Sequence, residues 1–125
     1  MTVAELIVPM GDYIRLREVA LDHPLADELD RAIVVSDDRI PGNIVTMHSR
    51  VVCHDESTGA THEIELVYPG EADPPKGRVS VLAPVGCALL GLAEGQAIDW
   101  DFPGGKPHRL RVERILRQSG GAAYE

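Results

Sequence analysis

The sequence is poor in the residues that mark several protein classes, and each shortage excludes one of them. It has only two cysteines, Cys53 and Cys87, in 125 residues, too few for a disulfide scaffold and typical of a reducing compartment. No apolar run approaches the roughly 20 residues that cross a bilayer, and the first residues lack the basic and apolar segments of a secretory signal. We therefore expect a cytoplasmic protein without a membrane span, and this length predicts one compact core.

Aromatic residues and positive charge are also scarce. A single Trp and a single Phe offer no aromatic-lined binding cleft. The formal net charge is −8, and most of it comes from residues 1–43, which hold nine acidic and four basic residues. A surface of this sign repels phosphate backbones, so the sequence favours a protein partner with a basic surface over naked nucleic acid.

The first third of the chain has helical periodicity. Apolar stripes lie on both sides of a His23-Pro24 break: Tyr13, Leu16 and Ala20 before it, and Leu25, Leu29, Ala32 and Ile33 after it. Proline suits the first turn of a helix, so the pattern predicts a short antiparallel helical hairpin with acidic residues at its tip, namely Asp22, Asp27 and Glu28. An arm of 12 residues would span only about 18 Å, and the polar segment 36–43 indicates a linker.

From residue 44 the apolar period changes to two, which predicts strands in segments 45–54, 63–68, 78–82, 98–102 and 110–116. Matching their apolar faces predicts two registers. The first sets Cys53 opposite Ile64 and His54 opposite Glu63; the second sets Trp100 opposite Leu110, Asp99 opposite Arg111 and Asp101 opposite Arg109. A helix is expected from Pro84 to Gly91. The sequence thus predicts an α+β chain, in which residues 1–43 form the hairpin and linker and residues 44–125 form an antiparallel sheet packed on one helix.

The motifs that could carry chemistry all have simpler structural explanations. Asp99 and Asp101 share a strand face, but the arginines opposite them indicate surface ion pairs. Cys53 and Cys87 lack the spacing of a zinc site, and no glycine cluster opens a helix as a phosphate-binding loop does. A solvated surface also explains the basic residues and the isolated histidines: Lys106, Arg109, Arg111, Arg114, Arg117, His23, His48, His62 and His108. We therefore predict no catalytic residue, no metal site and no cofactor.

Four short motifs remain, and they are specific only in combination: Val45–Val51, Leu66–Pro69, Ala83–Gly91 and Pro103–Gly105. In this order they resemble the C-terminal domain of the Gre-type transcript cleavage factors. The likeness covers residues 44–117 and is greatest to the short members of that family, the regulators of nucleoside diphosphate kinase. The resemblance implies that residues 44–125 form an FKBP-like domain, preceded by a hairpin shorter than the Gre coiled coil.

In Gre factors this domain docks on RNA polymerase at the secondary channel, and acidic residues at the coiled-coil tip help to hold a catalytic magnesium. The resemblance places the docking loop at Leu82, Ala83 and Pro84, of which only Pro84 matches the usual pattern, and it places the tip at Asp22–Glu28. It implies a non-enzymatic, monomeric regulator that competes with Gre factors without stimulating cleavage and meets DNA only within the transcription complex. Two alternatives remain open: an FKBP-like peptidyl-prolyl isomerase or chaperone, and a regulator of nucleoside diphosphate kinase by direct contact.

Overall fold

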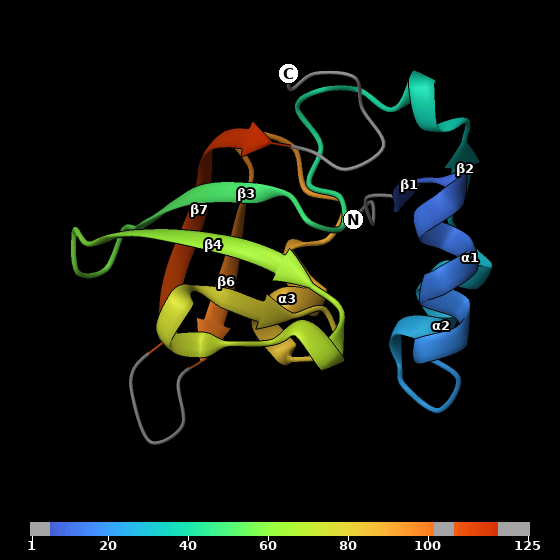
Figure 1. Cartoon of the computed structure of the whole chain (residues 1–125). Coiled ribbons are helices and arrows are strands. Elements are labelled where there is room, and N and C mark those ends of the chain that lie inside the picture. The colour runs from blue at the N-terminus through green and yellow to red at the C-terminus, as the bar shows by residue number, and fades with distance from the viewer. Residues whose placement is uncertain (1–5, 102–106, 118–125) are drawn as a thin grey trace.

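The computed structural model describes residues 6–101 and 107–117, except for the side chains of Trp100, Asp101, Pro107 and Arg117. An N-terminal unit, residues 6–35, contains β1 (Ile7–Pro9), α1 (Met10–Val19), α2 (Leu25–Asp30) and β2 (Ile33–Val35). The body, residues 44–117, contains β3 (Arg50–Asp55), β4 (Thr61–Val67), β5 (Arg78–Ser80), α3 (Pro84–Leu89), β6 (Ala97–Asp101) and β7 (Pro107–Arg117). Figure 1 shows α1 and α2 on one side of the sheet of the body.

Five strands of the body form one sheet in the order β5-β4-β3-β7-β6. Neighbouring strands are antiparallel, except that β5 pairs in parallel with β4. The predicted mixture of helices and strands is therefore confirmed, while the prediction of a purely antiparallel sheet is wrong for β5. The reason is the long connection before β5: the 3₁₀ turns η2 (Pro69–Glu71) and η3 (Pro74–Lys76) carry the chain back along the sheet, where a tight hairpin would have reversed it.

Both predicted registers are wrong by two residues. Val51 rather than Cys53 lies opposite Ile64, and Ile98 rather than Trp100 lies opposite Leu110. A shift of two residues leaves every side chain on its original face of the sheet. The hydrophobic pattern therefore predicts the faces correctly but cannot distinguish one register from the other.

A tight turn selects the register of β3 and β4. The Asp55 carboxylate accepts hydrogen bonds from the backbone N–H groups of Ser57 at 2.9 Å and Thr58 at 3.3 Å. The N–H of Gly59 then donates to the Asp55 carbonyl oxygen at 2.8 Å, with Gly59 at a φ of 81°. An aspartate that bonds to the backbone two residues on is a recurrent turn former, so the chain reverses sooner than alternation alone predicts.

The charge pairs of the last hairpin change with its register. Asp99 lies opposite Arg109 and accepts a 2.8 Å hydrogen bond from it, so the predicted partner Arg111 is wrong. Arg111 instead bonds to Glu56 at 2.5 Å, and Asp101 lies opposite Pro107 rather than Arg109. The predicted Pro-Gly-Gly turn lies outside the described residues.

A β-bulge reverses the alternation in the second half of β7. Cys53 lies opposite Val112 and Val52 opposite Arg114, so one residue of β7 is left over between the two pairs. Beyond such a bulge the inward and outward positions exchange. Ile115 therefore packs against the core, and Leu116, which simple alternation from Val112 would turn inward, is 45% exposed.

The first predicted strand begins late, because residues 45–49 form a turn. The N–H of Thr46 donates to the Ser49 hydroxyl at 2.8 Å, and the N–H of Ser49 donates to the Thr46 carbonyl oxygen at 3.1 Å. Between them His48 has a φ of 62°. Both hydroxyl side chains are fully buried, although the period-two alternation of segment 45–54 would turn Thr46 outward. A short polar side chain whose hydrogen bonds are satisfied locally can enter the core.

The N-terminal unit contains two helices where the periodicity predicts them, and both are shorter than predicted. α1 stops at Val19, before Ala20 of its predicted stripe, and α2 stops at Asp30, so that Ile33 lies in a strand instead of a helix. The three-residue strands β1 and β2 pair in parallel. No periodicity could predict strands this short. The predicted linker is also structured, since Asp37 accepts a hydrogen bond from the N–H of Gly11 at 3.0 Å and Ile40 is buried.

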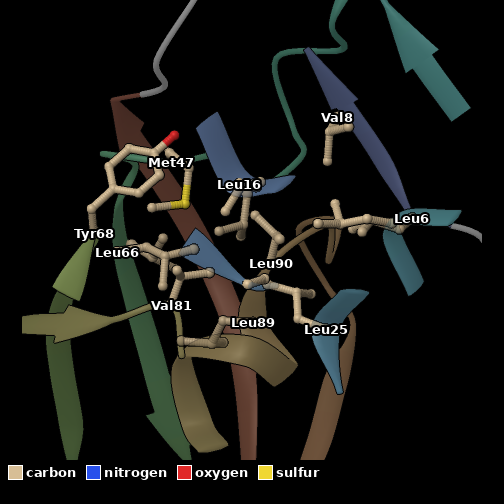
Figure 2. Close-up of a cluster of buried hydrophobic side chains, with 14 of the residues drawn as sticks. Leu6, Val8, Leu16, Leu25, Met47, Leu66, Tyr68, Val81, Leu89 and Leu90 are labelled. Atoms are coloured by element: carbon tan, nitrogen blue, oxygen red, sulfur yellow. The ribbon is translucent and has the colours of Figure 1, made fainter. Parts of the chain in front are cut away.

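One hydrophobic cluster joins the N-terminal unit to the body. Figure 2 shows Leu16 of α1 and Leu25 of α2 among Met47, Leu66 and Leu90 of the body. Leu16 and Met47 are completely buried. At roughly 1.5–3 kcal/mol for each large side chain removed from water, these contacts are a main source of the unit's stability. The boundary at residue 43 stays a prediction.

Close backbone packing sets the position of α3. A Cβ on Gly86 would lie 2.1 Å from the carbonyl oxygen of Ser80, so α3 approaches the end of β5 at a distance that only glycine permits. Leu89 then points into the core with no exposed surface, whereas its neighbour Ala88 is exposed. Within the described part of the chain, no helix is long and apolar enough to span a membrane.

Candidate functional site: a groove between the helix tip and α3

The tip between α1 and α2 contacts the loop before α3. Nε2 of His23, in the tip, lies 2.9 Å from the carbonyl oxygen of Leu82. On the other side of the ring, the N–H of Leu25 donates to Nδ1 at 3.0 Å. His23 is half-buried and thereby links two segments, 59 residues apart in the sequence, that the sequence analysis singled out separately.

A groove of about 560 Å³ opens beside this link. Its lining comes from the tip and α2, from the loop before α3, from α3 itself and from Leu6 just before β1, and it includes Leu6, His23, Glu28, Leu82, Pro84 and Cys87. Most of these side chains are apolar, and Glu28 supplies negative charge. The groove can therefore accept an apolar side chain whose neighbours carry positive charge.

The structure brings together part of the predicted site. Leu82 and Pro84 line the groove with Glu28, whereas Ala83, Asp22 and Asp27 do not. Pro84 is exposed, and Leu82 and Ala83 are half-buried. Asp22 and Asp27 are exposed at the tip and in the first turn of α2, where they can meet a partner without lining a cavity.

Ser80 holds the predicted docking loop in shape. Its hydroxyl accepts the N–H of Leu82 at 3.0 Å, and its carbonyl oxygen accepts the N–H of Ala83 at 3.0 Å. Pro84 follows at the first position of α3, where the lack of an N–H costs nothing. The exposed ring of Pro84 is thus presented on a loop that backbone hydrogen bonds define.

Cys87 is a structural residue of this groove. Burial raises the pKa of its thiol, and the nearby Glu28 carboxylate raises it further. Burial likewise raises the pKa of Cys53, inside the sheet, to about 11. Neither cysteine has the low pKa of a reactive thiol. Among the described residues no group of three or more His, Cys, Asp or Glu side chains could hold a metal ion.

A second set of contacts fixes the start of α1. Asp12 accepts the N–H of Met47 at 3.1 Å, and the guanidinium of Arg15 lies 3.9 Å from the centre of the Tyr68 ring. Nearby, His48 pairs with Glu71 at 2.8 Å, and that hydrogen bond lowers the pKa of Glu71. The N-terminal unit is therefore attached to the body both where α1 begins and at the tip.

Sequence reasoning missed two histidines. His23 and His108 were predicted to be solvated, yet His108 lies 2.7 Å from the buried Asp55. Burial alone would raise the pKa of Asp55, but hydrogen bonds from His108, Ser57 and Thr58 bring it below its ordinary value. No spacing in the sequence indicated the His108–Asp55 pair or the two contacts of His23.

Three comparisons with known proteins match this arrangement. The family "Transcription elongation factor, GreA/GreB, C-term" matches residues 40–117. The "Regulator of nucleoside diphosphate kinase" of Escherichia coli K12 is 44% identical over 103 residues, which cover 79% of this chain and 76% of that protein. The solved structure of a "Prokaryotic transcription elongation factor GreA/GreB" from Nitrosomonas europaea is 37% identical, with a TM-score of 0.82 over 92% of this chain and 100% of that chain.

A longer relative matches over a smaller share of this chain. The "Transcription elongation factor GreA" of Beijerinckia indica is 35% identical over 81 residues, which cover 65% of this chain. The matched region spans only 52% of that GreA. About half of that GreA therefore lies outside the matched region.

Proposed function

The chain belongs to the GreA/GreB family of transcription elongation factors, as its motifs predicted, and we propose that it regulates transcription by binding RNA polymerase at the secondary channel. Leu82, Ala83 and Pro84 form the docking loop in this proposal. The tip residues Asp22, Asp27 and Glu28 lie toward the entrance of the channel. The protein competes there with Gre factors and does not stimulate transcript cleavage.

The observation that carries the proposal is the hydrogen bond between His23 of the tip and Leu82 of the docking loop. Because the tip is attached to the docking loop, it lies beside the surface that would contact the polymerase and does not project far beyond that surface. The ten residues of α1 span about 15 Å. Acidic side chains on such an arm would stay near the channel entrance, away from the metal at the polymerase active centre.

The remaining parts of the proposal follow from the family. Residues 44–125 act as an FKBP-like docking domain, and residues 1–43 as an acidic hairpin with its linker. The regulator works as a monomer in the cytoplasm, has no catalytic residue and meets DNA only inside the transcription complex. The excess negative charge of residues 1–43 supports this last point, since it disfavours contact with phosphates.

Co-elution with core RNA polymerase tests the docking loop. We expect wild type to co-elute and Pro84→Glu to fail, because a charge would replace an apolar contact while a glutamate in the first turn of α3 preserves the helix. Pro74→Glu is the matched control: Pro74 is also exposed and opens a 3₁₀ turn but is not one of the proposed docking residues. Binding by Pro84→Glu at wild-type strength would exclude this docking surface.

A cleavage assay tests the regulatory role. Backtracked transcription complexes should show no faster RNA cleavage when the protein is added alone. When it is added together with a Gre factor, cleavage should slow as its concentration rises, because the two compete for one site. Faster cleavage by the protein alone would contradict the proposal.

A second candidate function rests on the 44% identical relative, whose name describes regulation of nucleoside diphosphate kinase. This chain would then contact that kinase directly. A pull-down that recovers the kinase and no polymerase would favour this function. The isomerase alternative has less support, because the apolar side chains that line the pocket near β4 and β5 are aliphatic, such as Ile64, Val79 and Val85, and do not form an aromatic cleft. Catalysis above background in a proline-isomerisation assay would favour this alternative.

A further inference from the structure

The two hydrogen bonds of His23 define the protonation state of its ring. Nδ1 accepts the N–H of Leu25, so it carries no proton. Nε2 faces the carbonyl oxygen of Leu82, which can only accept, so Nε2 carries the proton and donates it. Both bonds form together only with a neutral ring in this one tautomer.

Each of the two bonds has a separate structural effect. The bond from Leu25 is local: it satisfies an N–H at the start of α2, which no backbone carbonyl in the preceding turn accepts. The bond to Leu82 is long-range and joins the tip to the body. Removing the second bond while keeping the first would therefore release the tip without unwinding α2.

Few other polar contacts hold the tip. Asp12 and Arg15 act near the start of α1, at the opposite end of the unit. The acidic groups near His23 are Asp22 beside it and Asp27 and Glu28 of α2, and the uncharged thiol of Cys87 lies across the groove. Among the described residues, none of these four groups forms a hydrogen bond or ion pair with the docking loop, so the hydrogen bond of His23 is the directional link between the tip and that loop.

We infer that His23 is a positioning residue: it holds the acidic tip against the docking loop, so that both meet the partner as one preformed surface. This inference rests on the proposed function. Preformed surfaces bind more tightly because the free protein has already lost the conformational entropy that binding would otherwise cost. His23 need not touch the partner to have this effect.

His23→Asn separates the two bonds. An asparagine side chain accepts the N–H two residues on, as His23 does from Leu25, but it is too short to reach Leu82. His23→Ala loses both bonds. His62→Asn is the matched control, because His62 is exposed on β4, far from the tip.

The first measurement needs no polymerase. Long-range ¹H–¹⁵N NMR spectra at neutral pH should show that His23 is the neutral tautomer with its proton on Nε2. Amide hydrogen exchange in residues 24–30 should be roughly two- to tenfold faster in His23→Asn, the range expected for one lost hydrogen bond, and faster still in His23→Ala. A proton on Nδ1 instead, or unchanged exchange in His23→Asn, would overturn the inference.

The second measurement is the affinity for core RNA polymerase at matched thermal stability. We expect His23→Asn to bind roughly two- to tenfold more weakly and His62→Asn to bind like wild type. If wild type binds and His23→Asn binds equally well, the inference is wrong and the proposed function stands. If wild type does not bind, the proposed function is wrong, and so is the inference that His23 prepares the surface for binding. The NMR result would then still show whether His23 joins the tip to the docking loop.

Discussion

The N-terminal unit and the body of this protein are stabilised in different ways. Backbone ladders between long strands hold the body together, with β7 running for 11 residues between two partners. The N-terminal unit has helices of 10 and six residues and two strands of three, all below the lengths that are stable alone in water. The unit must therefore gain its stability from contact with the body.

Those contacts are of two kinds, and they have different roles. Buried leucines of α1 and α2 enter the core of the body and supply most of the free energy. Asp12, Arg15 and His23 add directional contacts at the two ends of the unit. The comparison shows how a short helical unit can be kept in place: the body holds it near both of its ends.

The body is most sensitive at Gly86. We expect Gly86→Ala to lower the free energy of unfolding by about 4 kcal/mol or more, because the added Cβ would overlap a backbone oxygen that cannot move aside. Urea unfolding measures the change. Gly42→Ala, with nothing within 4 Å of its added Cβ, should stay within about 0.5 kcal/mol of wild type. A tolerated Gly86→Ala would mean that α3 does not pack this closely.

The shared core is tested at Leu16, which is fully buried in α1. Leu16→Ala should cost about 3 kcal/mol, the usual range for a large core side chain, whereas Ile14→Ala, at a position 56% exposed, should cost little. Hydrogen exchange distinguishes two outcomes. If unit and body unfold together, amides of β3 and β7 lose protection along with those of α1. Loss confined to α1 would mean that the unit unfolds independently.

Asp55 gives the body a dependence on pH. Its pKa is lowered in the folded protein, so its ionised form stabilises the fold at any pH above the unfolded value of about 4. That contribution is lost as the pH falls from about 4 through the lower folded pKa. We expect Asp55→Asn to melt below wild type at pH 7, with the gap closing in acid; the exposed Asp38→Asn should show no such gap. A gap that is constant with pH would exclude this charge effect.

The smallest effect is expected at Arg15, on the attachment of α1 to Tyr68. Arg15→Met should lose about 0.5–1 kcal/mol, the value of a cation–π contact at a partly exposed site. Arg17→Met removes an arginine of the same helix that pairs with the exposed Asp30 and lies 5.9 Å from the centre of the Tyr13 ring, near the outer limit of a cation–π contact. It should therefore lose less. Thermal unfolding of the two variants compares them directly. Equal losses would show that the closer contact of Arg15 with Tyr68 adds nothing beyond a surface ion pair and a distant ring.

Prediction from the sequence succeeded where side-chain periodicity was decisive. The inward faces of β3 and β4 were predicted correctly, because alternation over several residues has only one solution with a buried face. Prediction failed where a single local contact took over. The Asp55 turn moved one register by two residues, and the bulge in β7 turned Leu116 outward. A shift by two residues leaves each side chain on the same face of the sheet, and a bulge adds a residue without a mark in the hydrophobic pattern. Neither feature can therefore be inferred from that pattern.

The candidate site also has a part that the sequence predicted and a part that it did not. The family motifs singled out Leu82–Pro84, and the acidic cluster singled out Asp22, Asp27 and Glu28, each from its own stretch of sequence. That Glu28 shares a groove with Leu82 and Pro84 was not predictable, since it depends on how the N-terminal unit lies against the body. His23, which links them, looked like an isolated polar residue.

The order of residue types along the chain was enough to establish the family, the mixture of helices and strands and the faces that become buried, because these depend on periodicity and short motifs. Only the folded molecule decided the strand registers, the parallel β5 and the contact between the helix tip and the loop before α3. These depend on backbone hydrogen bonds and on close approaches such as that of Gly86 to Ser80, which join residues whose separation in sequence carries no signal.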